Sequence, residues 1–190
     1  MFSVYLKLGF DHISDLKGYD HMLFLVALCA MYSYAEWKRV LVLITAFTIG
    51  HSITLALSSL NIIHFKPQLI EVLIPVTILL TAIKNLVFKP KNEKVWDPTY
   101  FLPLFFGLIH GMGFSNFFKS LLGQEADILL PLFAFNVGVE IGQICIVAVI
   151  MLINFIIIKG MSINQTNWNK VVSITAAILS GYMIVDRVFL

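Results

Sequence analysis

Long apolar runs separated by short polar segments are the main feature of this sequence. A helix that crosses the apolar core of a bilayer needs about 20 residues of this kind. The runs predict helices at about residues 20–35, 40–60, 69–88, 100–122, 128–158 and 171–190. The first 18 residues are too polar to span a membrane and predict an amphipathic helix or turn lying at the surface. We therefore expect an all-α fold, a polytopic membrane helix bundle with about six transmembrane helices in a single domain, 1–190.

Composition agrees with a membrane protein and sets aside other classes. Hydrophobic residues make up 59% of the chain and charged residues 13%, and the mean hydropathy is +0.89. A soluble domain of this length is far less apolar, so a lipid bilayer is the expected surrounding. The formal net charge of +2 is small, and we expect no nucleic-acid partner. Cys29 and Cys145 stand in separate apolar runs, which predicts neither a disulfide nor a CxxC metal motif.

The distribution of basic residues predicts the orientation. The segments after the first, third and fifth predicted helices, with the adjoining helix ends, hold Lys38, Arg39, Lys84, Lys89, Lys91, Lys94, Lys159 and Lys170. The opposite side holds fewer: Lys7, Lys17, Lys66, Lys119 and Arg187. Because cytoplasmic loops carry an excess of lysine and arginine, we expect the first set inside the cell and both termini outside. No cleavable signal peptide is visible, since charged residues interrupt the first predicted segment.

The fifth apolar run contains one carboxylate, Glu140, and no other charged side chain between residues 128 and 158. An ionisable group near the middle of a bilayer costs at least a few kcal/mol, so a partner inside the protein must face it. Asn136, Glu140 and Gln143 follow one another at helical spacing and give this helix a single polar stripe.

Histidines stand at two depths of the predicted bundle. His51 and His110 fall near the middle of their helices, whereas Asp20 and His21 stand at the start of the first helix, preceded by His12 on the N-terminal segment. We expect the residues at the mouth to receive a cation that the two deeper histidines hold together with the carboxylate of the fifth helix.

Small residues at four-residue spacing predict which helices touch. Gly107, Gly111 and Ser115 form such a ridge on the fourth helix, and Gly138 and Gly142 form one on the fifth. Ridges of small residues let helices approach closely in a membrane. We therefore expect the fourth and fifth helices to pack together, which brings the histidine of one near the carboxylate of the other.

The chemistry of the candidate ligands indicates the kind of ion. Imidazole and carboxylate together suit transition metals such as nickel, cobalt or zinc, and not calcium or magnesium. The predicted metal ligands are His12, Asp20, His21, His51, His110 and Glu140. Neutral side chains on the same helices are candidates to hydrogen-bond these ligands: Thr48, Ser52, Asn136 and Gln143.

Four blocks of the sequence resemble the HupE/UreJ family of small bacterial membrane proteins. They are GFDHISDLKGYDHMLFLVAL (9–28), TAFTIGHSITL (45–55), FGLIHGMGF (106–114) and FNVGVEIGQ (135–143), so the first and last of them span most of the chain, from 9 to 143. The resemblance is to the shorter branch of this family. It implies a multi-pass protein of the bacterial inner membrane that carries nickel or cobalt in connection with hydrogenase or urease maturation.

The resemblance also implies which residues act. They are His12, Asp20, His21, His110 and Glu140. Seven residues separate the first of these histidines from the aspartate, where the nickel permeases have five, and the glutamate stands one helix beyond the His-Gly motif.

Three functions fit a buried cluster of this composition. The first is a permease for a divalent transition metal, with ligands stepped from the mouth to the middle of the membrane. The second is a membrane-embedded metallohydrolase in which Glu140 activates a zinc-bound water, so the sequence leaves open whether the protein is an enzyme. The third is a non-catalytic accessory subunit. The sequence also leaves open a homo-oligomer and protein partners in metalloenzyme maturation.

Overall fold

A computed structural model describes residues 1–88, 100–123 and 128–189. The basic residues Lys89, Lys91 and Lys94, which entered the orientation argument, lie outside the described residues. The described part of the chain is helical and contains no strand. The expected all-α membrane bundle is confirmed.

Seven helices and three short turns make up the described chain. The helices are α1 (Phe2–Ser14), α2 (Tyr19–Ala30), α3 (Trp37–Ser59), α4 (Pro67–Val87), α5 (Phe101–Leu122), α6 (Leu129–Phe155) and α7 (Gln165–Phe189). Two 3₁₀ turns, Leu16–Gly18 and Tyr34–Glu36, precede α2 and α3, and a π-helical turn, Ile156–Gly160, extends α6. The last five helices are long and apolar enough to cross a membrane, and α2 is a shorter apolar helix.

The outer surface of the bundle is apolar where a lipid bilayer would meet it. On α6 the large exposed side chains from the middle of the helix onward include the aliphatic residues Ile141, Ile144, Val149, Leu152 and Ile153. The buried side chains include many polar ones, among them His51, His110, Gln143 and Asn85. Polar groups inside and apolar groups outside are the arrangement that a membrane requires of a helix bundle.

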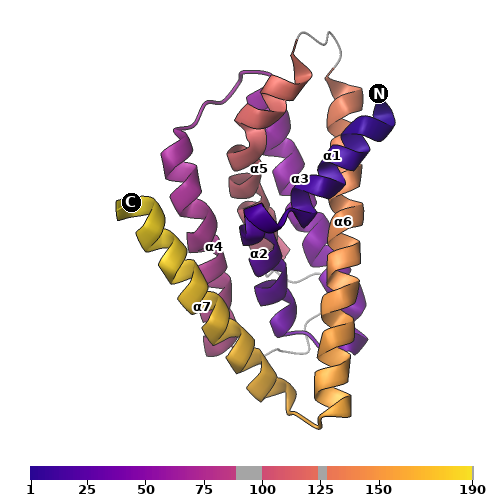
Figure 1. Cartoon of the computed structure of the whole chain (residues 1–190), viewed down its shortest axis with the longest axis vertical. Coiled ribbons are helices and arrows are strands. Elements are labelled where there is room, and N and C mark those ends of the chain that lie inside the picture. Colours follow the sequence, from indigo (N-terminus) through magenta and orange to yellow (C-terminus); the bar gives the residue numbers. More distant parts are fainter. Residues whose placement is uncertain (89–99, 124–127, 190) are drawn as a thin grey trace.

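The first two helices follow each other down the bundle. Figure 1 shows α1 beside the upper part of α6 and α2 below it, with the turn Leu16–Gly18 between them. The N-terminal segment is thus a helix whose outer face is exposed, while Tyr5, Gly9 and Ile13 are buried on its inner face. The break leaves helix ends inside the bundle, as broken helices do where they line a cavity in membrane transporters.

Glycines let α3 and α5 approach to backbone contact. A Cβ atom on Gly107 would overlap the carbonyl oxygen of Phe47, and one on Gly50 would overlap that of Leu104. Gly111 lies one turn after Gly107 and makes the same kind of contact with the backbone of His51. Gly107 meets the carbonyl oxygen of Phe47, and Gly111, four residues later, meets that of His51, also four residues later, so α3 and α5 run parallel.

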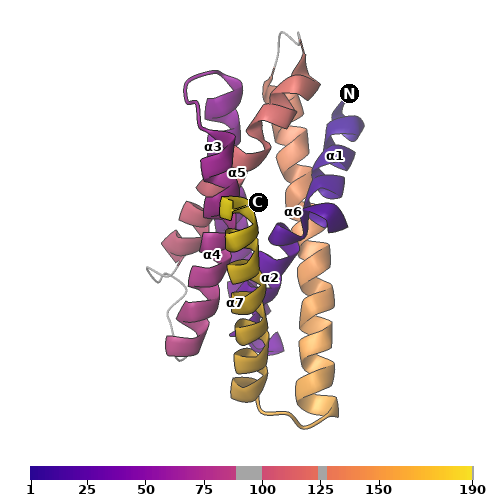
Figure 2. The same cartoon turned by 60° about the vertical axis from the view of Figure 1, so that its left-hand side comes forward.

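The same kind of contact joins α1 to α6. A Cβ atom on Gly9 would overlap the carbonyl oxygen of Phe135, and one on Gly138 would overlap that of Leu6. These helices also run parallel to each other, and Figures 1 and 2 show that this pair descends where α3 and α5 ascend. The bundle therefore contains two glycine-locked pairs of opposite direction, α1–α6 and α3–α5.

The expected contact between the two glycine ridges is wrong. The ridge of the fourth predicted helix packs against α3, and that of the fifth packs against α1. What joins α5 to α6 is aromatic: Phe114 and Phe135 stack with ring centroids 5.0 Å apart, and Phe118 lies 5.0 Å from Phe135. A small-residue ridge indicates that some helix approaches closely, but it does not specify which one.

The close approach at Gly107 yields a prediction for stability. We expect Gly107→Ala to lower the free energy of unfolding by roughly 1–3 kcal/mol, because the added methyl group meets the Phe47 backbone, which cannot move without separating α3 from α5. Thermal unfolding in detergent measures the effect. Gly181→Ala on α7 is the matched control, since nothing lies within 4 Å of its Cβ position. Equal unfolding temperatures for the two variants would contradict the prediction.

Candidate metal centre

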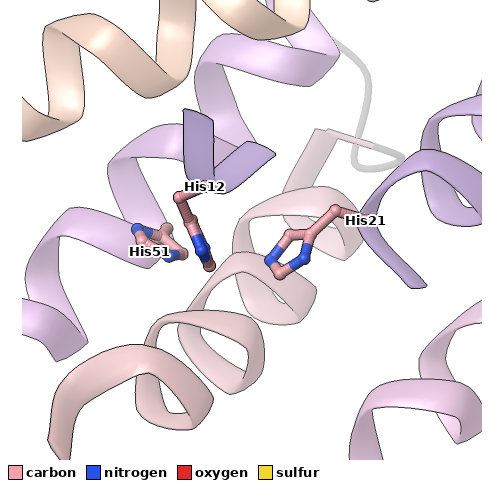
Figure 3. A group of neighbouring side chains, drawn as sticks. All are labelled: His12, His21 and His51. Carbon is pink, nitrogen blue, oxygen red and sulfur yellow. The ribbon is translucent and has the colours of Figure 1, made fainter. Parts of the chain in front are cut away.

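Three histidines from separate helices converge in the interior (Figure 3). His12 comes from α1, His21 from α2 and His51 from α3, and their ligand nitrogen atoms all lie within 4.8 Å of one another. The ring centroids of His12 and His21 are 4.8 Å apart, and those of His12 and His51 are 5.9 Å apart. We call these residues the trihistidine group.

The glycine-locked pairs position two of the three rings. His51 directly follows Gly50, the residue at which α3 touches the backbone of α5. His12 follows Gly9 by three residues, so it lies one turn below the contact of α1 with α6. Each of these rings therefore projects from a helix that cannot shift easily against its neighbour.

Asp20 orients the third ring. Its Oδ1 accepts hydrogen bonds from the backbone N–H of His21, at 2.9 Å, and from Nδ1 of the His21 ring, at 3.0 Å. A carboxylate at Nδ1 fixes the proton on that nitrogen, so the lone pair of Nε2 is directed to the interior. A histidine held in this way by a carboxylate is a common arrangement at metal sites.

The trihistidine group offers nitrogen atoms that nothing else in the described structure uses. Nε2 of His12 and Nε2 of His21 are buried without a hydrogen-bond partner among the described residues, and the buried ring of His51 has the side chain of Asn136 beside it. Buried polar atoms are nearly always paired, so these atoms point to a ligand or to water. Three imidazoles suit zinc, nickel or cobalt. Around a tetrahedral ion with bonds of about 2.0–2.1 Å, nitrogen atoms are roughly 3.3 Å apart, so modest ring rotations are needed to close the group.

His110 lies next to the group without being part of it. Its ring centroid is 5.0 Å from that of His21, and its Nε2 lies 3.0 Å from the hydroxyl oxygen of Thr77. That hydroxyl donates its hydrogen to the carbonyl of Ile74 at 2.7 Å, so it accepts the hydrogen of Nε2–H. The lone pair of His110 is then on Nδ1, which is buried and without a partner among the described residues.

Phenylalanine rings surround the imidazoles. Phe114 lies 3.9 Å from His12, Phe47 lies 5.0 Å from His110, and Phe135 stacks on His51 at 6.3 Å, all between ring centroids. These walls exclude water on the sides where they lie, so the nitrogen atoms have few alternatives to a bound ligand.

A cavity of about 220 Å³ gives access to the site. It is lined by two rings of the trihistidine group, by His110 and by charged side chains that include Asp15, Asp20, Glu71 and Arg187. Arg187 closes one side of it, donating to the carbonyl oxygen of Glu71 at 2.6 Å and to Oδ2 of Asp20 at 3.3 Å. The Glu71 carbonyl is available because Pro75, four residues later in α4, has no N–H to donate to it.

Glu140 is not brought into this group. Its Oε1 accepts a hydrogen bond from Thr45 at 2.6 Å, across the interface of α6 with α3, and its Oε2 is buried without a partner among the described residues. Of the predicted ligands, the structure thus brings together His12, His21 and His51, with Asp20 behind His21 and His110 adjacent, and places Glu140 elsewhere.

The four side chains that were predicted to support the ligands lie on α3 and α6. Thr48 donates to Oε1 of Gln143 at 2.8 Å, so this pair joins α3 to α6. Ser52 donates to the carbonyl of Thr48 at 2.7 Å, within its own helix. Asn136 donates to the carbonyl of Leu132 on its own helix at 2.8 Å, and its side chain also meets the ring of His51.

Sequence reasoning missed two contributors to the site. Arg187 bonds to Asp20 across 167 positions of sequence, and nothing local indicated that contact. Thr77 was not singled out, although it stands four residues before Thr81 in an apolar helix, and this spacing was the available signal of a polar face.

Comparison with known proteins identifies the family. The family model described as HupE / UreJ protein matches residues 1–187. No match was found among curated proteins or among solved structures. The match covers nearly the whole chain, including every residue of the trihistidine group, so the chain belongs to the HupE/UreJ family.

Proposed function

We propose that the protein is a membrane permease for a divalent transition metal of the nickel or cobalt type. The observation that supports this most is the trihistidine group, in which three imidazoles from three helices, two buried and one half-buried, lie beside a cavity lined by carboxylates. Nitrogen ligands select transition metals over the more abundant calcium and magnesium, and the carboxylates attract cations to the cavity. The nickel and cobalt handling associated with the HupE/UreJ family agrees with this donor set.

Entry in this proposal begins at the break between α1 and α2. Asp15, Gly18 and Asp20 from this break line the cavity, and His21 carries the first ring beyond them. The break, the first turns of α4 and the last turn of α7 lie in the same half of the bundle as both termini in Figure 1. With the termini outside the cell, the cation enters from the outer face.

A metallohydrolase is the second candidate, because three histidines beside a cavity also describe a catalytic zinc site with an open fourth position. Such an enzyme needs a general base near the metal. Glu140 was the predicted base, and its bond to Thr45 holds it outside the trihistidine group. Asp20, which is nearer, is engaged by His21 and Arg187. These contacts favour the permease.

Removal of one ring tests the metal site and transport together. We expect His51→Ala to lower nickel affinity at least tenfold and to reduce nickel uptake into proteoliposomes to background, because two remaining nitrogen ligands bind weakly. Isothermal titration measures the affinity and a chelator dye inside the vesicles measures the uptake. His51→Gln, of similar volume, controls for packing, and His64→Ala, a histidine of the α3–α4 connection, controls for nonspecific binding. Parent protein that binds nickel but does not carry it would exclude the permease.

The position of Glu140 outside the trihistidine group predicts that it is not a metal ligand. We expect Glu140→Gln to keep nickel affinity within about threefold of the parent, since Glu140 bonds to Thr45 and not to the trihistidine group. The same titration measures it, with His21→Ala as the variant that loses affinity. A loss in Glu140→Gln equal to that in His21→Ala would show that the carboxylate is a ligand.

Orientation is tested with single cysteines. In a background of Cys29→Ala and Cys145→Ala, we expect Ser3→Cys to react with a membrane-impermeant maleimide in intact cells, because the N-terminus faces outward. We expect Met161→Cys, in the exposed connection of α6 to α7, to react only after permeabilisation. The reverse pattern would place both termini and the cavity on the inner side.

A further inference from the structure

The inner face of α4 carries a line of polar side chains below His110. Thr77, Thr81 and Asn85 follow one another at four-residue spacing, so they lie on one face of the helix. Their exposed fractions are 1%, 4% and 5%. A polar line this well buried within an apolar helix faces the interior of the bundle and not lipid.

At its upper end the polar line of α4 contacts the ring of His110 through Thr77. Thr77 accepts the hydrogen of His110 Nε2, and this leaves the buried Nδ1 of that ring without a partner among the described residues. Thr81 donates its own hydrogen to the carbonyl of Thr77 at 2.9 Å. Both hydroxyl hydrogens are thus committed to the backbone of α4, and the oxygen atoms present lone pairs to whatever passes beside them.

The lower end of the line reaches a second, smaller cavity. Its volume is about 10 Å³, and Thr81, Lys84 and Asn85 line it on the α4 side. A space of this size admits one water molecule when polar groups border it. Asn85 donates its amide nitrogen to the carbonyl of Ala27 at 2.6 Å, so its Oδ1 is the remaining acceptor of that side chain.

The other walls of the small cavity are mostly apolar, so the polar groups that border it come mainly from α4. Away from α4, Leu28, Leu43 and Phe106 line it with apolar side chains, and Tyr32 is the one lining residue there whose side chain carries a polar atom. The polar contacts between α3 and α6 do not continue downward in the same way, because Thr45 and Glu140 meet at an exposed edge of that interface. The face of α4 therefore carries a line of buried polar side chains that leads from His110 to the small cavity.

We propose, on the basis of the proposed function, that Thr77, Thr81 and Asn85 form the inner half of the permeation route. The cation leaves the trihistidine group beside His110 and passes along the hydroxyl and amide oxygens of α4 to the small cavity. Oxygen ligands hold nickel or cobalt less tightly than imidazoles do, so each step is weak enough to leave. Lys84 at the lower end repels a divalent cation and shortens its stay there.

Removing the hydroxyl of Thr81 tests the route apart from the binding site. We expect Thr81→Val, which keeps the shape of the side chain, to lower the maximal rate of nickel uptake into proteoliposomes about tenfold and to leave the nickel affinity of the detergent-purified protein unchanged. Thr81→Ser should restore the rate. Asn85→Leu should behave like Thr81→Val. Thr54→Val is the matched control, because Thr54 is a buried threonine that bonds to its own helix on α3, away from the route.

The outcomes separate the route from the proposed function. Uptake at the parent rate in both Thr81→Val and Asn85→Leu would overturn the route while leaving the permease intact. A loss of nickel affinity together with uptake, or an equal loss in Thr54→Val, would show that these residues act only in packing. Background uptake by the parent protein would refute the permease, and the route with it, before any variant is compared.

Discussion

Backbone contact between helices is the constraint on which the rest of this structure depends. At Gly107 and Gly9 one helix presses against the carbonyl groups of another so closely that no side chain fits. These contacts fix α3 on α5 and α1 on α6, and two of the three histidines of the centre, His12 and His51, project from these helices close to the contacts. Without a hydrophobic force between helices in lipid, such close packing is a main source of stability. The positions of these two imidazoles thus follow from the positions of the glycines, whereas Asp20 orients His21.

Two kinds of interior surround the histidines. Phenylalanine rings from α2, α3, α5 and α6 give apolar walls, whereas the break after α1 and the polar face of α4 give openings lined by oxygen and charge. Nε2 of His12 and Nε2 of His21 lie between these environments, buried and without a protein partner among the described residues. This imbalance makes the centre a stronger candidate for a cation than the isolated pair of Glu140 with Thr45, which satisfies itself in part.

The sequence was sufficient for some features of the protein and not for others. Apolar runs predicted the five long membrane helices, because the hydrophobic requirement is local to each run, but the run at 20–35, expected to span, forms the shorter helix α2 of 12 residues. Which helices pair was not predictable from the ridges, since Gly107 and Gly138 each found a partner other than the one expected. Glu140 was expected in the centre because it is the one charge of its run, but helical spacing does not tell toward which neighbour a stripe turns. The bond between Arg187 and Asp20 joins the two ends of the chain and has no local signal.

The three histidines of the centre lie early in the chain, and this order affects how the protein is assembled in the membrane. All of them come from the first 51 residues, whereas the glycines that fix their helices from the other side, Gly107 and Gly138, are synthesised later. During insertion the imidazoles therefore exist before the walls that hold them in place. A nascent protein can expose these side chains to metal while they are still loosely arranged, and it acquires a shaped centre only when α5 and α6 enter the membrane.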